Sequence, residues 1–210
     1  MNNDQINLTN KNNKKIIKVG ITGGTGSGKS SVCNYLTKKG LQVIDSDAIA
    51  RKLLDRDTVT YDLVVSHFGE KILKANGEIN RQLLSSIVFG SSDELNFLQN
   101  VVTKETVEIV KKLLEKSRPE MKIIFLDAPL LFETGLDQDV DIVWFVLASQ
   151  EKRLKRLSKR DGIPVFEIEK RMSAQMPEEQ KEMLADIVIE NEGSLDDLYS
   201  KVDKLLLQLI

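Results

Sequence analysis

The most constraining feature of the chain is a glycine-rich loop between an apolar segment and a helix-like segment. Five glycines occur within the nine residues Gly20–Gly28, and Lys29, Ser30 and Ser31 follow them. Glycine destabilises regular elements, so this run indicates a place where something must approach bare backbone. Residues 23–30, GGTGSGKS, match the pattern G-x-x-x-x-G-K-[ST] without a departure. The loop is therefore predicted to hold the phosphates of a nucleoside triphosphate.

Each part of this P-loop has a predicted chemical task. Successive backbone N–H groups form a concavity for phosphate oxygens, and the following helix adds the positive end of its dipole. Lys29 is expected to reach the β- and γ-phosphates, and the Ser30 hydroxyl is placed to bind Mg²⁺. The nucleotide-binding residues predicted in the loop are Gly24, Thr25, Gly26, Ser27, Gly28, Lys29, Ser30 and Ser31.

Five apolar segments alternate with helix-like segments along the chain. They span residues 15–21, 41–47, 122–131, 140–147 and 185–191. Continuous apolar strands that alternate with helices are typical of a parallel sheet covered on both faces. The pattern predicts a doubly wound α/β fold of the P-loop NTPase type with five parallel strands. Ligands of such sheets bind at the carboxyl ends of the strands.

Two segments interrupt this alternation. Residues 61–119 read as mostly helical and predict a helical insertion, with a turn at 74–80 and a break at 89–94. Residues 150–183 are rich in Arg, Lys and Glu and have little apolar content, which predicts a mobile helical lid. The expected organisation is a disordered tail (1–13), the insertion, the lid, and a core made of 14–60, 120–149 and 184–210.

Composition excludes some classes of function and favours others. The net charge is −2, whereas general nucleic-acid binders carry a strong basic excess, so we expect no nucleic-acid partner. A single cysteine, Cys33, favours a reducing compartment. The chain has no apolar run of about 18 residues, and its asparagine-rich start is unlike a secretory signal. We therefore expect a cytoplasmic protein with no membrane partner and favour a monomer.

Two acids follow the second predicted strand. Asp45 and Asp47 are expected at its carboxyl end, which faces the phosphates. The segment is expected to be extended to residue 47, so the two carboxylates are predicted to share one face. A carboxylate there can take a proton from an attacking hydroxyl or hold a metal-bound water. The alternative is that either acid caps the next helix.

Arginines recur along the predicted lid. Arg153, Arg156 and Arg160 are spaced by three and four residues, so they fall along one helical face. Most such charge runs are solvated surfaces. Phosphoryl transfer, however, builds negative charge on the migrating group, and an arginine on a closing lid neutralises it and excludes water. Arg156 and Arg160 are the predicted lid contacts, with Arg156 preferred for the phosphates.

The remaining motifs distinguish classes of nucleotide protein. A GTPase switch is disfavoured, because Asn10-Lys11 lacks the following x-Asp and Asp127 is not followed by x-x-Gly. The readings left open are a small-molecule kinase acting on one of several acceptors and a nucleotide-binding regulator without transfer activity.

A set of motifs in order resembles the dephospho-CoA kinases. It comprises the P-loop, VIDSDAIAR, GEINRQLLSSIVF, LDAPLLFETGLD, RLKRLSKRDG with RMSAQ, and ADIVIENEGS, spanning residues 16 to 205. The Pro-Leu-Leu-x-Glu loop and the Ala-Asp/Asn-Gly ending are more specific than the P-loop. The resemblance implies that ATP phosphorylates the ribose 3′-hydroxyl of dephospho-CoA in the last step of coenzyme A synthesis.

The resemblance also implies roles for individual residues. Asp47 would be the base beside the attacking hydroxyl, and Asn191 and Gly193 would lie near the adenine of ATP. Independently of the resemblance, the motif and the strand ends predict Mg²⁺ at Ser30, with Asp45 or Asp127 as a contact through water; a structural hydrogen bond is the alternative for Asp127. The implied acceptor-binding residues are Asp47, Arg51, Arg81, Pro129, Leu130, Leu131 and Glu133.

The chain departs from the family pattern at three places. Ser46 replaces the alanine between the two acids, and Asn80 replaces an aspartate before Arg81. The family's Leu-His-Pro triplet is replaced by Val102-Thr103-Lys104. The phosphate chemistry does not depend on these positions.

Overall fold

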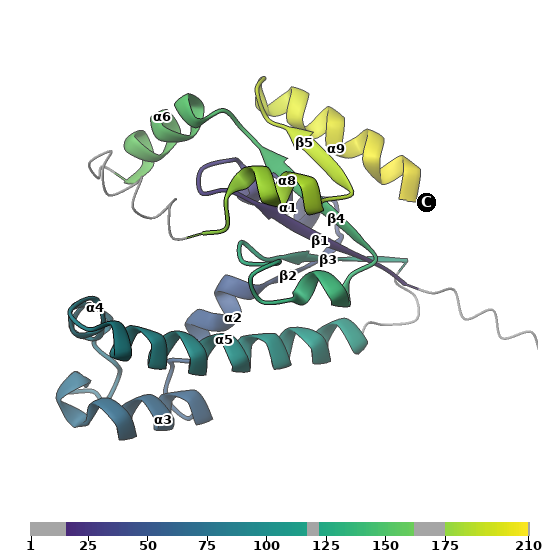
Figure 1. The fold of residues 1–210 in the computed structure, drawn as a ribbon. Coiled ribbons are helices and arrows are strands. Elements are labelled where there is room, and N and C mark those ends of the chain that lie inside the picture. Colours follow the sequence, from purple (N-terminus) through teal and green to yellow (C-terminus); the bar gives the residue numbers. More distant parts are fainter. Residues whose placement is uncertain (1–15, 117–121, 162–174, 210) are drawn as a thin grey trace, which may run out of the picture.

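The chain builds a five-stranded sheet with helices on both faces, as seen in a computed structural model that describes residues 16–116, 122–161 and 175–209 (Figure 1). The strands are β1 (Ile17–Gly23), β2 (Gln42–Asp45), β3 (Ile123–Asp127), β4 (Ile142–Leu147) and β5 (Ile187–Glu190). All neighbouring pairs are parallel, in the order β2-β3-β1-β4-β5. The predicted doubly wound fold is confirmed. The tail predicted for residues 1–13 lies outside the described residues.

The central position of β1 decides where the site lies. Its neighbours are β3 and β4, with Ile21 beside Asp127 on one side and Trp144 on the other. All five strands end at the same edge, and the P-loop leaves β1 at the middle of that edge. Residues that end β2, β3 and β4 are therefore brought to the P-loop by the sheet itself.

Helices connect the strands and form the insertion and the described part of the lid. They are α1 (Lys29–Lys38), α2 (Ser46–Lys52), α3 (Val59–Phe68), α4 (Arg81–Phe89), α5 (Ser92–Glu115), α6 (Gln150–Asp161), α8 (Glu178–Leu184) and α9 (Leu195–Leu209). Two short 3₁₀ helices span Glu70–Ile72 and Leu136–Asp139.

Each face of the sheet has its own apolar core. On one face, α1 and α9 pack on the sheet through a buried cluster that includes Val32, Leu36, Trp144 and Val202. The opposite face is covered by α5, which lies below the sheet in Figure 1. Because both faces are buried, the strands read as continuous apolar runs rather than alternating ones.

The insertion has a third core, and α5 links it to the sheet. α3, α4 and the first half of α5 enclose a cluster that includes Val64, Phe68 and Leu84. Val110 and Leu114, in the second half of α5, pack instead against the sheet. The segment predicted as one insertion (61–119) therefore ends in a helix that belongs to both bodies.

Gly40 ends α1, and Asn80 begins α4. Gly40 has φ +80°, its N–H donates to Thr37 O, and the Leu41 N–H donates to Leu36 O. This pair of bonds is the Schellman ending that glycine favours. Asn80, the replacement for the family's aspartate, caps α4 by accepting from the Leu83 N–H at 3.2 Å. Asparagine caps as well as aspartate, so the departure preserves the start of α4.

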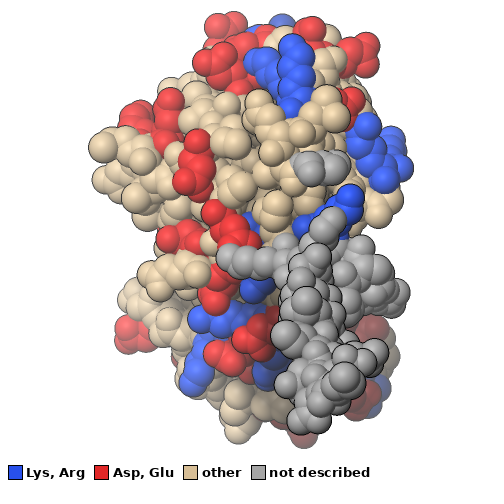
Figure 2. Space-filling view, turned by 90° about the vertical axis from the view of Figure 1, so that its right-hand side faces the viewer, with Lys and Arg blue, Asp and Glu red and all other residues tan. Residues whose placement is uncertain are grey.

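The surface carries both signs of charge. On the face drawn in Figure 2, acidic and basic side chains intermingle and neither sign covers the surface. No helix within the described ranges combines the length and apolar content that crossing a bilayer requires. The expected monomer, the cytoplasmic location and the lack of a nucleic-acid partner stay predictions.

Close packing beside β1 predicts the effect of enlarging Gly20. A Cβ at this position would lie 2.9 Å from Leu131 Cδ2 and 3.2 Å from Val140 Cγ2, and the Leu131 side chain is fully buried. We expect Gly20→Ala to lower the free energy of unfolding in urea by about 1–3 kcal/mol, the usual cost of overpacking.

Gly90→Ala is the matched control. A Cβ there has no neighbour closer than 3.4 Å and φ is −85°. Its expected effect is a gain of about 0.5 kcal/mol, because alanine restricts the unfolded chain. Equal stabilities of the two variants would contradict tight packing at Gly20.

Candidate active site

The P-loop lines a cavity of about 440 Å³ at the carboxyl edge of the sheet. Gly26 and Gly28 have φ of +84° and +101°, a conformation that residues with a Cβ rarely adopt. The two positive φ values let the chain curl before α1 begins at Lys29. Every predicted P-loop residue lines this cavity: Gly24, Thr25, Gly26, Ser27, Gly28, Lys29, Ser30 and Ser31.

Lys29 forms an ion pair with Asp127 at the base of the cavity. Asp127 is the last residue of β3, next to β1, and both side chains are nearly buried. The Asp127 carboxylate holds Lys29 here, which matches the structural bond that the sequence left open, and the water-mediated metal contact of Asp127 stays a prediction. Burial of the nearby Cys33 thiol, together with the negative charge of Asp127, raises the pKa of that thiol, which therefore stays protonated.

The two predicted acids lie on different elements. β2 ends at Asp45, whose Oδ1 accepts from the Ala48 N–H at 2.8 Å and caps α2. Asp47 lies in the first turn of α2. The expectation that both carboxylates share a face of an extended segment was wrong, because the cap at Asp45 ends the strand two residues earlier. The helix-capping alternative is confirmed for Asp45.

Asp47 is the charged residue of the two, Asp47 and Pro129, that line two neighbouring cavities. It lines the P-loop cavity and also a smaller, mainly apolar groove, which we call the acceptor groove. The pKa of Asp47 is raised, chiefly by partial loss of hydration, and the nearby Lys29 opposes this rise. The carboxyl group is thus a stronger proton acceptor than an ordinary aspartate.

The acceptor groove lies between α2, α5 and the loop after β3. Val102 and Thr103 line it, so the missing Leu-His-Pro triplet falls at the groove beside Asp47. Pro129 and Leu130 also line it, and their implied contacts with the acceptor stay predictions. The lining is completed by Ser46, Ala50, Thr106, Val107, Ala128, Thr134 and Leu136.

Two residues of the Pro-Leu-Leu-x-Glu loop do not face the groove. Leu131 is fully buried and packs beside Gly20, so its implied contact with the acceptor is corrected to a role in the core. Glu133 accepts from Lys181 at 2.7 Å and from the Met176 N–H at 3.0 Å. Its carboxylate is therefore engaged by the segment that returns from the lid.

Arg51 and Arg81 lie along the route from α2 into the insertion. Arg81 Nη2 donates to Arg51 O at 2.8 Å and pairs with Asp55 at 3.1 Å. It lines a separate cleft of about 590 Å³ with Arg56 and Lys74 among its neighbours. The guanidinium of Arg51 lies 3.9 Å from Asp45. The implied acceptor contacts of both arginines stay predictions.

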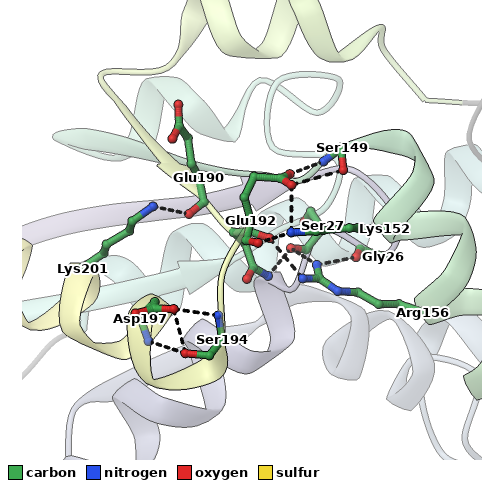
Figure 3. Close-up of polar contacts among 11 residues, drawn as sticks. Gly26, Ser27, Ser149, Lys152, Arg156, Glu190, Glu192, Ser194, Asp197 and Lys201 are labelled. Atoms are coloured by element: carbon green, nitrogen blue, oxygen red, sulfur yellow. Dashed lines mark hydrogen bonds and ion pairs between the residues drawn. The ribbon is translucent and has the colours of Figure 1, made fainter.

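Helix α6, in the segment predicted as a lid, packs against the P-loop through two arginines. Arg156 lines the cavity, but its Nη1 donates to Ser27 O at 3.2 Å and to Gly26 O at 3.4 Å, as Figure 3 shows. Arg153, 4% exposed, donates to Thr25 O at 2.9 Å and pairs with Glu178 of α8. Arg153 was the arginine least favoured as a phosphate contact in the sequence analysis, yet of the two arginine side chains of α6 that the structure describes it is the more buried. The side chain of Arg160 lies outside the described residues.

The turn after β5 also holds the P-loop. The side-chain amide of Asn191 donates to Ser27 O at 2.7 Å, and Asn191 O accepts from Arg156 Nη2 at 3.1 Å. A Cβ at Gly193 would lie 2.5 Å from Asp197 Oδ2, which explains the glycine. Contacts of Asn191 and Gly193 with adenine stay predictions.

Comparison with known proteins agrees with this geometry. The family model described as dephospho-CoA kinase matches residues 17–197. The chain belongs to the dephospho-CoA kinase family. A dephospho-CoA kinase of Fusobacterium nucleatum is 39% identical over 90% of this chain and 96% of its own length. One from Arabidopsis thaliana is 39% identical over 91% of this chain and 83% of its own length.

Solved structures give the same family fold. A crystal structure of a Thermus thermophilus protein has 33% identity and a TM-score of 0.76, covering 93% of this chain and 98% of that one. The dephospho-CoA kinase from Campylobacter jejuni has 26% identity and a TM-score of 0.69, covering 91% and 96%.

Sequence reasoning missed three residues of the dephospho-CoA kinase site. Gln175 accepts from Thr25 Oγ1 at 3.4 Å, and Glu178 lies against Gly24. Lys181 is fully buried. All three lie in the last part of the segment predicted as the lid (150–183), where the sequence shows only a charged, polar run. That pattern normally indicates a solvated face, so no local signal distinguished them.

Removing the Lys29 ammonium group tests the phosphate site. We expect Lys29→Ala to lower turnover of ATP by about two orders of magnitude or more, because Lys29 is predicted to bind the β- and γ-phosphates. Turnover and thermal unfolding are measured together. Lys38→Ala, at the exposed end of the same helix, should keep wild-type turnover. Equal turnover in both variants would remove Lys29 from the phosphate site.

Proposed function

We propose that the protein transfers the γ-phosphoryl group of ATP to the ribose 3′-hydroxyl of dephospho-CoA and so forms CoA and ADP. The observation that carries this proposal is the position of Asp47 on both the P-loop cavity and the acceptor groove. A donor in one and an acceptor in the other would meet at this carboxylate. The names of the relatives support dephospho-CoA as the acceptor. The reaction would be the final step of coenzyme A synthesis.

The P-loop would supply the donor side. Its N–H groups and Lys29 would bind the phosphates, and Lys29 would exchange Asp127 for phosphate oxygens. Arg156 already lines the cavity and would turn from backbone carbonyls to the migrating group. Arg160 would act from the same helix.

The protein residues fit a magnesium ion bound with the nucleotide. Mg²⁺ prefers hard oxygen donors and is held by one or two protein groups plus substrate phosphates. Ser30 at the P-loop and Asp127 at the end of β3 offer a hydroxyl and a carboxylate of this kind. The ion would supply charge neutralisation on the phosphates.

Asp47 would act as the base for a direct, in-line transfer. It would accept the proton of the acceptor hydroxyl as that oxygen bonds to the γ-phosphorus and the bond to the ADP oxygen breaks. His67, the one histidine of the chain, stacks on Phe97 in the insertion. This location supports transfer without a phosphorylated protein intermediate.

The substrate assignment is tested by ADP release with ATP, Mg²⁺ and dephospho-CoA, with adenosine and AMP as control acceptors. We expect rapid release only with dephospho-CoA, and CoA as the product. Tight ATP binding without turnover of dephospho-CoA would support a different acceptor or a regulator and would overturn the proposed reaction.

The pH dependence of kcat/KM tests Asp47. A raised pKa means that the carboxyl stays protonated to a higher pH, so activity should fall as pH decreases through a value above the ordinary 3.9 of aspartate. Asp47→Asn should lower kcat by about 10²-fold or more and abolish this acid limb. Asp62→Asn, which changes an exposed side chain in α3, should keep the wild-type kcat and the acid limb. An acid limb that persists in Asp47→Asn would assign the titration to another group.

A further inference from the structure

Lys181 is a lysine in an unusual place. It lies in α8 and is fully buried, whereas lysines are almost never buried unless they are paired. Its Nζ donates to Pro129 O at 3.0 Å and pairs with Glu133 Oε1 at 2.7 Å. A buried charge is costly unless such contacts satisfy it. The ammonium group therefore keeps Pro129 O and the Glu133 carboxylate in place.

The partners of Lys181 join three segments that are far apart in the sequence. Pro129 O also accepts from Thr22 Oγ1, at the end of β1, at 3.2 Å. Glu133 Oε1 also accepts from the Met176 N–H at 3.0 Å. The ammonium group therefore ties the edge of the sheet, the loop after β3 and the segment that leads into α8.

This junction lies between the two cavities of the site. Pro129 lines both the P-loop cavity and the acceptor groove, and Leu130 lines the groove alone. On the other side of the junction, Gln175 and Glu178 contact the P-loop at Thr25 and Gly24. Displacing Lys181 would therefore move both the loop that lines the acceptor groove and the residues that contact the P-loop.

We propose that Lys181, through Pro129 and Glu133, is a positioning residue for phosphoryl transfer. It holds the loop after β3, which lines the acceptor groove, in a fixed position relative to the P-loop. The proposal rests on the proposed function of the site. Lys181 lines neither cavity, so it acts on the substrates through the residues that it holds. A misplacement of the reacting groups by about 1 Å costs up to about 10²-fold in rate. A fixed position of this loop therefore matters more for kcat than for nucleotide binding.

The test compares Lys181→Met, Lys181→Arg and wild type by steady-state kinetics and by the ratio of ADP formed to CoA formed. For Lys181→Met we expect kcat to fall about tenfold or more, with KM for ATP within about twofold and a raised ADP:CoA ratio. Lys181→Arg keeps the charge and the donors and should recover most of kcat. Thermal unfolding gives the folded fraction by which each rate is corrected.

Lys111→Met is the matched control, since Lys111 pairs with Asp139 at 3.4 Å on the surface and should keep wild-type kinetics. An active wild type with an equally active Lys181→Met variant overturns this proposal alone. A rate loss explained entirely by the folded fraction also overturns it. A wild type that forms no CoA overturns both proposals.

A second variant decides the matter if Lys181→Met does not fold. Glu133→Gln keeps the shape of the side chain and an oxygen for the Met176 N–H, but removes the charge opposite Lys181. We expect a several-fold loss of kcat with KM for ATP unchanged. Wild-type kcat in this variant would overturn the positioning role.

Discussion

A loop that turns its N–H groups towards a ligand turns carbonyl oxygens away from it, and these oxygens need donors of their own. Three side chains supply them here. Arg153 donates to Thr25 O, while Arg156 and Asn191 both donate to Ser27 O. The donors come from α6 and from the turn after β5, so the P-loop is held in shape by segments at least 120 residues away in the chain. The phosphate site is therefore a property of the whole fold rather than of an eight-residue motif.

The same edge of the sheet concentrates charges whose balance depends on the nucleotide. Asp127 holds Lys29, while Lys29 lowers the pKa of Asp47 against the rise that partial burial and the carboxylates of Asp45 and Asp127 produce. Phosphates that bind Lys29 would neutralise its charge and weaken this lowering. The pKa of Asp47 therefore depends on the charges around Lys29 as well as on the burial of its own carboxyl group.

Patterns local in the sequence predicted the fold well, whereas roles that depend on distant partners were not predictable. The strands, the P-loop and the position of Asp47 at the sheet edge followed from apolar runs and motif spacing. The prediction that Asp47 shares an extended segment with Asp45 was wrong, because Asp45 caps α2 and so ends β2, which the apolar pattern does not reveal. Leu131 and Glu133 have the residue types of a binding loop, yet one is core and the other meets Lys181 from 48 residues further along. Nothing in a charged run tells which cation is buried.

The two described ends of the lid are attached in unequal ways. Arg156 on α6 donates to carbonyls at the rim of the cavity, and phosphate oxygens can replace these acceptors without leaving its charge unpaired. Lys181 on α8 has no such substitute, because it is fully buried and faces Glu133 and Pro129. Separating a buried pair of this kind costs about 3–5 kcal/mol. The Arg153–Glu178 pair, which joins α6 to α8, is buried to nearly the same degree as the Lys181–Glu133 pair, so the contact that phosphate oxygens can replace is that of Arg156 alone among these three cations.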